Sequence, residues 1–370
     1  MREPTRRQIF AMSFVALLSP ATRLIPGAAA RAAGHAAWLC PIVAAPFVML
    51  VAALVSRALS TKAQGEGLGE TILRATPHFG RFVLFNYGLW MALYAGFSVR
   101  SAASRFIYTV YTGSSPWPFV AVGLGMGLLA ALGHERRLAR SSEFFRVLLL
   151  IAVVPILVLG MAQADWSELL PVSYLDAPGL LFGAIETLGT VCFILVNVPF
   201  LETGAPIEKR TRSAVFWSIR VCLFLAVLIA AVIGRFGPEL SGSLTYPFFA
   251  LVRNTGLFGV AERIEAPVTA LWVLSDFVLC AISLMTAARA ITASLSLKAK
   301  PERPKYLHPG TLVTIACAAL ALACSLVIAP DSRIMRIVSD KWVVFANIAA
   351  IFALLLPALA ITAHQKAKQS

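Results

Sequence analysis

Three ionisable residues, Arg23, Glu186 and Asp276, lie inside long apolar stretches of the sequence. A charged side chain near the middle of a bilayer costs roughly 2.5–3.5 kcal/mol or more unless it finds a partner or water. A carboxylate there can accept an ammonium group, bind a cation or carry a proton. These three residues are therefore the first candidates for binding a solute or coupling an ion.

Helix-breaking residues surround Arg23 in the stretch LLSPATRLIPGAAARAAG, Leu17 to Gly34, which contains Pro20 and Pro26. A proline inside a helix removes one hydrogen bond and blocks another. In a membrane such a break persists only where it is buried in protein or lines a polar cavity. The sequence therefore predicts a cavity beside this segment.

A second interrupted stretch, LLFGAIETLGTVCFILVNVPFLE from Leu180 to Glu202, carries polar and glycine residues in its centre. Corresponding interruptions in the two halves of a transporter indicate its binding site. At 1.5 Å per residue, Arg23 and Glu186 lie about 5 Å and about 4.5 Å outward of the middle of their spans. We therefore expect an Arg23–Glu186 contact, direct or through water or substrate. The alternative is a buried pair that only fixes two broken helices.

Further polar residues complete the predicted site. Asn86, Trp90, Tyr94 and Ser98 recur every four residues on one helix face, which either lines the site or packs against a neighbouring helix. Arg100 and Arg105, near the end of that helix, are expected to snorkel to the interface. Asp276 predicts coupling to a proton or cation, or else bonds a nearby Ser, Thr or Arg. The predicted substrate-binding residues are Ser19, Ala21, Thr22, Arg23, Asn86, Trp90, Tyr94, Glu186, Thr187, Gly189 and Thr190.

The elements that must position these residues are membrane spans. Hydrophobic residues make up 59% of the 370 residues and charged residues only 14%, whereas a soluble domain is about 45–50% apolar. An all-α integral membrane protein with about ten transmembrane helices is expected. The predicted spans are Ile9–Ala30, Ala37–Val55, Phe82–Ser101, Trp117–Leu132, Phe145–Met161, Ala177–Leu201, Ala214–Ile233, Pro267–Ala288, Thr311–Ala329 and Trp342–Ile361.

Lysine and arginine alternate between the two sides of this layout. With the N-terminus in the cytoplasm, the loops on that side carry 19 of them and the opposite loops carry 7. The positive-inside rule therefore places both termini in the cytoplasm. This distribution also explains the net charge of +14 without a nucleic-acid partner, because the basic residues form no continuous face. The histidines and cysteines show no metal-ligand spacing, so no metal or cofactor is expected.

The stretch from Tyr246 to Phe277, YPFFALVRNTGLFGVAERIEAPVTALWVLSDF, resembles the Tyr-Pro … Arg … Glu-Arg-x-Glu … Trp signature of the spore germination permease family. GHAAW at Gly34–Trp38 also resembles that family. The resemblance implies a LeuT-like fold of the amino acid–polyamine–organocation transporter superfamily. The chain is then a single transmembrane domain with a five-plus-five inverted repeat, residues 1–163 and 164–370, in which spans 1 and 6 are broken.

The resemblance also implies a function. The family forms the B subunits of nutrient germinant receptors, which bind a small germinant such as an amino acid and work with A and C subunits in the spore inner membrane. Tyr246 and Pro247 would belong to the outer lid between spans 7 and 8. This sequence departs from the family pattern at Glu186, which lies a turn before the usual carboxylate, and at Asp276, where an uncharged residue is usual.

Two other functions compete with a germinant-binding subunit. An ion-coupled secondary transporter, in the cell membrane, would move an amino acid or polyamine with H⁺ or Na⁺. A membrane enzyme is disfavoured because no motif pairs a nucleophile with a base and no His-Glu-x-x-His is present. Flux through reconstituted vesicles separates a transporter from a receptor that only binds.

Overall fold

The computed structural model describes residues 4–60, 68–109, 111, 113–172, 177–197, 200, 210–255, 265–296, 309–327 and 337–369. The secondary structure in these ranges is helical throughout, without strands. Seven helical regions are long and apolar enough to cross a membrane, and the first of them, Arg6–Arg57, contains two helices and the short segment between them. Two shorter apolar helices, Trp117–Ala131 and Val344–Leu355, accompany them. The all-α membrane fold is confirmed, and the count of ten spans stays a prediction.

The helices follow one another with short connections. In chain order they are α1 (Arg6–Ala33), η1 (Gly34–Leu39), α2 (Cys40–Ser60), α3 (Leu68–Ala75), α4 (Pro77–Thr109), α5 (Trp117–Ala131), α6 (Glu135–Ala162), η2 (Trp166–Leu169), α7 (Ala177–Asn197), α8 (Arg210–Ser243), α9 (Pro247–Asn254), α10 (Glu265–Ser294), α11 (Pro309–Val327), the π-helical η5 (Val338–Val343) and α13 (Val344–Gln369).

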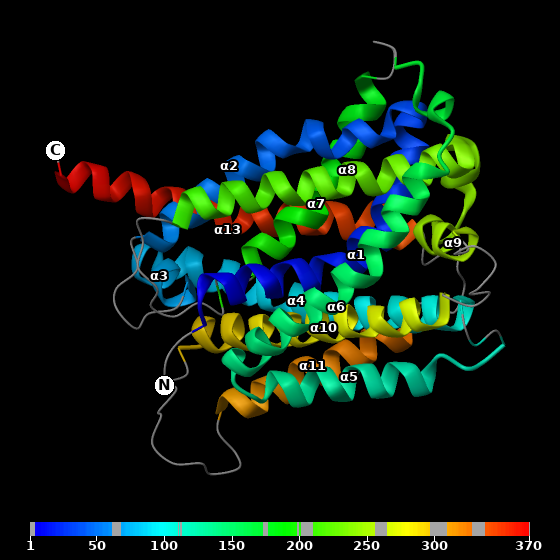
Figure 1. Cartoon of the computed structure of the whole chain (residues 1–370). Helices are drawn as coiled ribbons and strands as arrows, with labels where there is room; N and C mark the ends of the chain where they lie inside the picture. The colour runs from blue at the N-terminus through cyan, green and yellow to red at the C-terminus, as the bar shows by residue number, and fades with distance from the viewer. Residues whose placement is uncertain are drawn as a thin grey trace.

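The long helices lie side by side in one bundle (Figure 1). The short helices α3 and α9 lie at its opposite ends, which we call the α3 end and the α9 end. Helix α1 passes through the middle and packs against α6, α7, α8 and α10, while α10 packs along α4. Most of α1 is buried, so its residues form the core around which the other helices gather.

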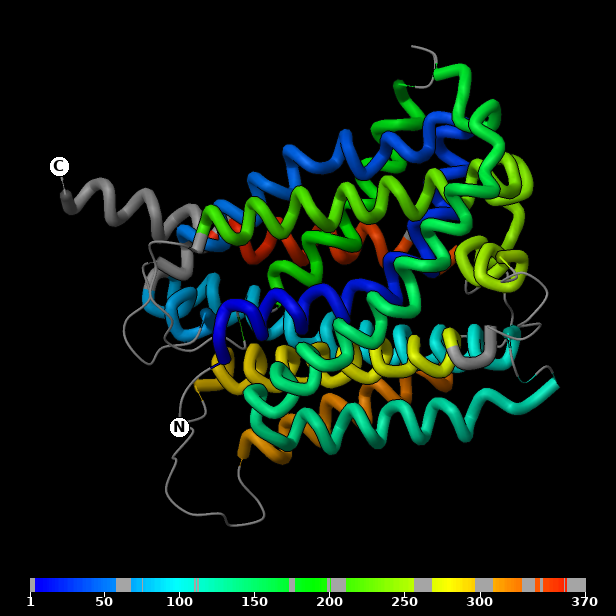
Figure 2. Tube along the Cα trace, viewed as in Figure 1, coloured from blue at the N-terminus to red at the C-terminus, as the bar shows by residue number. Residues whose placement is uncertain are grey.

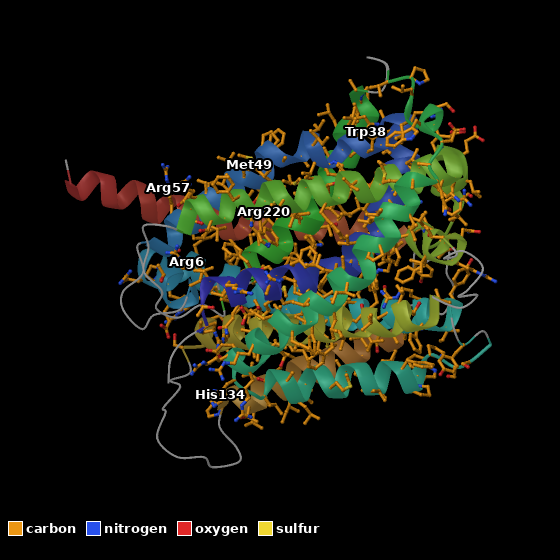
Figure 3. The ribbon with its side chains drawn as sticks, in the orientation of Figure 1. Arg6, Trp38, Met49, Arg57, His134 and Arg220 are labelled. Atoms are coloured by element: carbon orange, nitrogen blue, oxygen red, sulfur yellow. The ribbon has the colours of Figure 1, made fainter. Side chains whose placement is uncertain are left out.

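The outer surface of the bundle is apolar. Large hydrophobic side chains such as Leu129 (73% exposed) and Ile151 (66% exposed) point away from the core. A water-soluble protein does not expose so many large apolar side chains, whereas lipid solvates them at no cost. Figure 3 shows the side chains of Arg6 and Arg57 toward the α3 end, as expected for basic residues that flank the spans. The protein is a multi-pass integral membrane protein.

The predicted break in span 1 does not interrupt its helix. Helix α1 runs from Arg6 to Ala33 with Pro20 and Pro26 inside it. Proline fits the helical φ angle, so two prolines cost hydrogen bonds without forcing the backbone out of the helix. Figure 2 shows α1 changing direction partway along its length, which is the usual result of lost ladder bonds. The expected interruption is therefore a bend.

The predicted break in span 6 is also wrong. Helix α7 runs without interruption from Ala177 to Asn197. Its glycines allow close packing instead of unwinding: a Cβ on Gly183 would meet Cys40, and one on Gly189 would meet Val344. Since small residues let membrane helices approach closely, this stretch is a packing surface.

Candidate functional site

The bend in α1 is opened by a side chain from another helix. In a regular helix the Ser19 amide would donate to the Val15 carbonyl. Here the Ser19 amide donates to Ser275 Oγ at 2.9 Å, and Ser275 Oγ donates to the Val15 carbonyl. The next residue, Pro20, has no amide to donate to the Ala16 carbonyl. A hydroxyl from α10 thus bridges the α1 ladder where proline has weakened it.

A buried ion pair lies directly beside this opening. Asp276 accepts hydrogen bonds from Ser19 Oγ and from Arg105 Nη2, and Arg105 Nη1 donates to Ser19 Oγ at 3.2 Å. The Arg105 side chain is 0% exposed and that of Asp276 is 12% exposed. Burying both charges is tolerable because each has a partner of opposite charge. Asp276 therefore makes the bonds to Ser and Arg that the sequence left as its alternative, and its role in ion coupling stays a prediction.

Arg23 contrasts with Arg105. It is only 5% exposed, and none of its three guanidinium nitrogens has a hydrogen-bond partner among the described residues. Its guanidinium lies over the Phe97 ring, 5.6 Å from the centroid. The ionisable groups close enough to act on it electrostatically are Tyr94, Asp276, Arg105 and Tyr246. A buried guanidinium with five unused N–H donors is a strong site for a carboxylate.

The predicted direct contact between Arg23 and Glu186 is wrong. Arg23 donates to no described residue, and the carboxylate that acts on it is that of Asp276. Glu186 instead lies close enough to Cys40 of α2 to act on it electrostatically. The sequence predicts similar depths for the two charges along the membrane, but depth does not determine which way a helix turns its side chains. A contact through water or substrate stays a prediction.

The other predicted site residues of α1 and α7 also lie in different surroundings. Thr22 accepts a hydrogen bond from Trp272 Nε1 at 2.9 Å, beside the opened ladder, and Ala21 is buried in the core. On α7, Thr187 and Thr190 donate their hydroxyls to carbonyls of their own helix. Ser19 and Thr22 of α1 therefore belong to the polar centre, whereas the hydroxyls of Thr187 and Thr190 bond within α7.

The predicted polar face of α4 is split. Tyr94 is buried and lies near Arg23. Its ring packs edge to face with that of Phe193, with the two centroids 4.7 Å apart. Trp90 donates to Asn347 of α13 at 3.1 Å, and Asn86 is exposed and donates to the Phe82 carbonyl. Of Asn86, Trp90 and Tyr94, only Tyr94 lies beside the polar centre.

Several residues of the centre escaped the sequence analysis. The expectation that Arg105 snorkels is wrong, because α4 continues to Thr109 and holds Arg105 inside the protein. Arg100 is 3% exposed and donates to Ser104. Trp272 and Ser275 were not singled out, although both lie within a turn of Asp276. That proximity was one signal, and the family resemblance of the Tyr246–Phe277 stretch, whose signature includes Trp272, was another.

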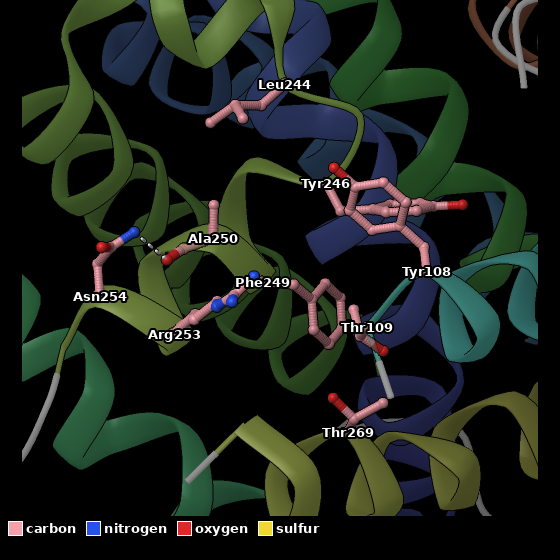
Figure 4. A pocket seen from close by; sticks show the side chains of 9 residues that line it. All are labelled: Tyr108, Thr109, Leu244, Tyr246, Phe249, Ala250, Arg253, Asn254 and Thr269. Carbon is pink, nitrogen blue, oxygen red and sulfur yellow. Dashed lines mark hydrogen bonds between the residues drawn. The ribbon is translucent and has the colours of Figure 1, made fainter. Parts of the chain in front are cut away.

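A pocket of about 370 Å³ opens at the α9 end (Figure 4). Tyr246, the N-cap residue of α9, lines it, and Pro247 begins that helix and packs near Gly27 of α1. The Phe249 ring lies against the pocket and 5.1 Å from the Arg105 guanidinium carbon. The lining residues are Tyr108, Thr109, Leu244, Tyr246, Phe249, Ala250, Arg253, Asn254 and Thr269.

Polar and ring contacts join several helices at the α3 end. Arg289 of α10 donates to the Phe200 carbonyl and to Glu135 of α6, both at 2.7 Å. The Tyr87 hydroxyl donates to Asn197, and the Tyr87 ring stacks on Phe200 with centroids 5.2 Å apart. These contacts join four helices around the inner end of α7.

The fold and this centre define a class of protein. The structure resembles that described as "Substrate-bound outward-open state of a Na+-coupled sialic acid symporter reveals a novel Na+-site", with a TM-score of 0.59 and 13% identity over 88% of this chain and 74% of that one. At this identity the likeness shows the fold alone. The protein is therefore a multi-pass membrane protein with a LeuT-like fold.

A family model described as "Spore germination protein" matches residues 5–333. The chain therefore belongs to the family of spore germination permeases, as the Tyr246–Phe277 stretch predicted. A search of curated proteins found no match.

Proposed function

We propose that the protein is a germinant-receptor subunit that binds a small carboxylate-bearing nutrient, such as an amino acid, at the bend of α1. The observation that carries this proposal is the Arg23 guanidinium, which is buried without a hydrogen-bond partner among the described residues. An unpaired buried charge destabilises a protein, so its retention needs a compensating role. Binding a ligand carboxylate supplies the missing partner.

The bend offers acceptors for the other end of an amino acid. Pro20 and Pro26 lack the amides that would pair with the carbonyls of Ala16 and Thr22. Such carbonyls can accept hydrogen bonds from a ligand ammonium group. Tyr94 supplies a ring beside Arg23. The predicted α7 residues, Glu186 included, would join the site only if α7 moves when ligand binds.

Orientation and partners belong to the same proposal. The 19-to-7 distribution of lysine and arginine supports a cytoplasmic α3 end with both termini inside. Closure of the segment containing Tyr246 and Pro247 over the bound ligand would shift a two-state equilibrium that A and C subunits detect in the spore inner membrane. Residues 1–163 and 164–370 would form the two repeats.

An ion-coupled transporter of amino acids or polyamines is the second candidate, because Asp276 is a carboxylate at the centre of the bundle. Coupling to H⁺ or Na⁺ would require Asp276 to release Arg105 and Ser19 during the cycle. Uphill uptake by reconstituted vesicles would favour this function. Saturable binding with negligible flux would favour the receptor.

The test is a thermal-shift screen of amino acids, nucleosides and sugars on the purified protein, with Arg23→Met beside the parent. Arg220→Met is the matched control, because Arg220 is an exposed arginine of α8. We expect a carboxylate-bearing compound to raise the Tm of the parent and the control but not that of Arg23→Met. Equal stabilisation of all three proteins would refute the site.

A further inference from the structure

The pocket at the α9 end is separate from the centre around Arg23. Two residues of the α9 segment stand between them: Phe249 lines the pocket and faces Arg105, and Tyr246 lines it and lies within electrostatic reach of Arg23. Phe249 is 5% exposed and packs against Trp272 with centroids 5.6 Å apart. The Phe249 ring therefore separates the pocket from the Arg105–Asp276 ion pair.

The pocket has an unused polar group. Thr269 of α10 is 0% exposed, and its hydroxyl has no hydrogen-bond partner among the described residues. Figure 4 shows its side chain pointing toward Phe249 and Thr109. Leaving a buried hydroxyl unpaired costs about 1–3 kcal/mol, so a ligand that bonds it regains that energy.

The charges around the pocket favour an anion. Arg253 lines its wall, and Arg100, Arg105 and Arg23 act electrostatically on Tyr246 from behind. Among the described residues at the centre, Asp276 alone opposes these arginines. The rings of Tyr108, Tyr246 and Phe249 provide an apolar wall. The volume of about 370 Å³ lies within the range of small-molecule sites, roughly 300–1,000 Å³.

We propose that this pocket is a second binding site, which captures a small carboxylate with an apolar body before Phe249 admits it to the Arg23 site. Arg253 holds the carboxylate, the three rings hold the apolar body, and Thr269 bonds a remaining polar group. The inference rests on the proposed function for the identity of the solute. The two sites can be tested separately, because Arg253 supplies the positive charge of the pocket and Arg23 that of the central site.

Photo-crosslinking with L-photo-leucine, a diazirine analogue of leucine, tests the second site on the full-length protein. Labelled peptides are mapped by mass spectrometry, with excess L-leucine as competitor and leucinol, which lacks the carboxylate, as control. Ala250→Trp fills the pocket from its wall, and Ser243→Trp adds the same bulk at an exposed position that does not line it. Arg23→Met removes the central site only.

We expect labels on the peptides containing Tyr108 or Phe249 in the parent, Ser243→Trp and Arg23→Met. L-leucine competes for them and leucinol does not. Ala250→Trp should reduce these labels at least about tenfold, equivalent to about 1.4 kcal/mol. Labels confined to α1 and the middle of α4, or pocket labels lost in Arg23→Met, would overturn the second site and leave the proposed function standing. Pocket labels without any label that depends on Arg23 would support the second site and refute the proposed function.

Discussion

Arg23 and Arg289 are two arginines of one bundle with opposite surroundings. Arg289, near the α3 end, donates to a carbonyl and to a carboxylate, both at 2.7 Å. Arg23, in the bend of α1, is more deeply buried and has no hydrogen-bond partner among the described residues. Arg289 joins neighbouring helices through its hydrogen bonds, while Arg23 keeps N–H donors that a ligand carboxylate could use.

The same difference extends to the two ends of the molecule. At the α3 end, contacts of Arg289, Glu135, Tyr87 and Asn197 join the helices, although Asn197 Nδ2 has no hydrogen-bond partner among the described residues. The α9 end keeps a pocket and the unpaired hydroxyl of Thr269. A solute should therefore reach Arg23 from the α9 end, where the pocket lies. Access from the α3 end should require the contacts of Arg289 to break.

The largest expected effect is at Arg105, the satisfied neighbour of Arg23. Arg105→Met leaves Asp276 buried, with Ser19 as its one remaining hydrogen-bond partner among the side chains that the structure describes. Removing one member of a buried ion pair typically costs about 3–5 kcal/mol. Thermal unfolding of the purified variant should show a large fall in Tm.

The double variant Arg105→Met with Asp276→Leu is the control for that prediction. It removes both charges, so it should recover most of the lost stability. If the single variant is as stable as the parent, the ion pair does not hold α1 to α4 and α10.

A smaller effect is expected at the α3 end. Glu135→Gln removes one of two partners of Arg289, whose side chain is 35% exposed and thus partly solvated. The loss of stability should be about 1 kcal/mol or less, as for partly exposed ion pairs. Ligand affinity should not fall, because Glu135 lies outside the proposed site. A cysteine introduced at Ala290 should become more reactive to a thiol reagent in Glu135→Gln. Unchanged reactivity would show that the Arg289–Glu135 ion pair does not restrict access at this end.

Ser275→Ala examines the opening in α1 directly. Without the bridging hydroxyl, the Ser19 amide and the Val15 carbonyl can pair with each other, so we expect a stability change within about 1–2 kcal/mol. The Ser19 amide should become slower in hydrogen exchange, and ligand affinity should fall because α1 straightens. Ser283→Ala, which removes an unpartnered buried hydroxyl from the same helix, is the matched control and should leave both unchanged. Faster exchange at Ser19 in Ser275→Ala would contradict the bridge.

The smallest effect concerns pH at the α9 end. Hydrogen bonds from the Ser167 hydroxyl and amide lower the pKa of the Asp165 carboxyl, which lies outside the spans and is exposed. A lowered folded pKa gives stability that is present above the unfolded value of about 3.9 and is lost as pH falls through the folded pKa. Ser167→Ala should therefore lower the Tm slightly at neutral pH and not below the folded pKa. A Tm difference that grows as pH falls would have the wrong sign.

Sequence reasoning succeeded where composition and local pattern decide the outcome. The apolar spans and the family membership follow directly from the residues. The α4 face shows a limit: steps of four residues rotate by about 40° each on a helix of 3.6 residues per turn, so Asn86 and Ser98 end about 120° apart. Asn86 is accordingly exposed while Ser98 is buried.

The partners of the charged residues could not be predicted, because spacing gives depth but not the direction in which each helix faces. Arg105 was missed because the span was expected to end at Ser101, whereas α4 continues to Thr109. The expected break in span 1 is wrong because α1 stays helical from Arg6 to Ala33, and a hydroxyl 256 residues away in the chain bonds the Ser19 amide.

Equilibrium binding of the ligand from the thermal-shift screen, measured with parent, Arg23→Met and Arg220→Met, tests the central claim most directly. The account predicts that Arg23→Met binds at least about thirtyfold more weakly, since a buried charged contact contributes about 2–5 kcal/mol. It also predicts that the ligand-free variant is as stable as the parent or more so, because an unpaired buried charge has been removed. Unchanged affinity, together with a fall in stability as large as that of Arg105→Met, would show that Arg23 is a structural residue and would contradict the account.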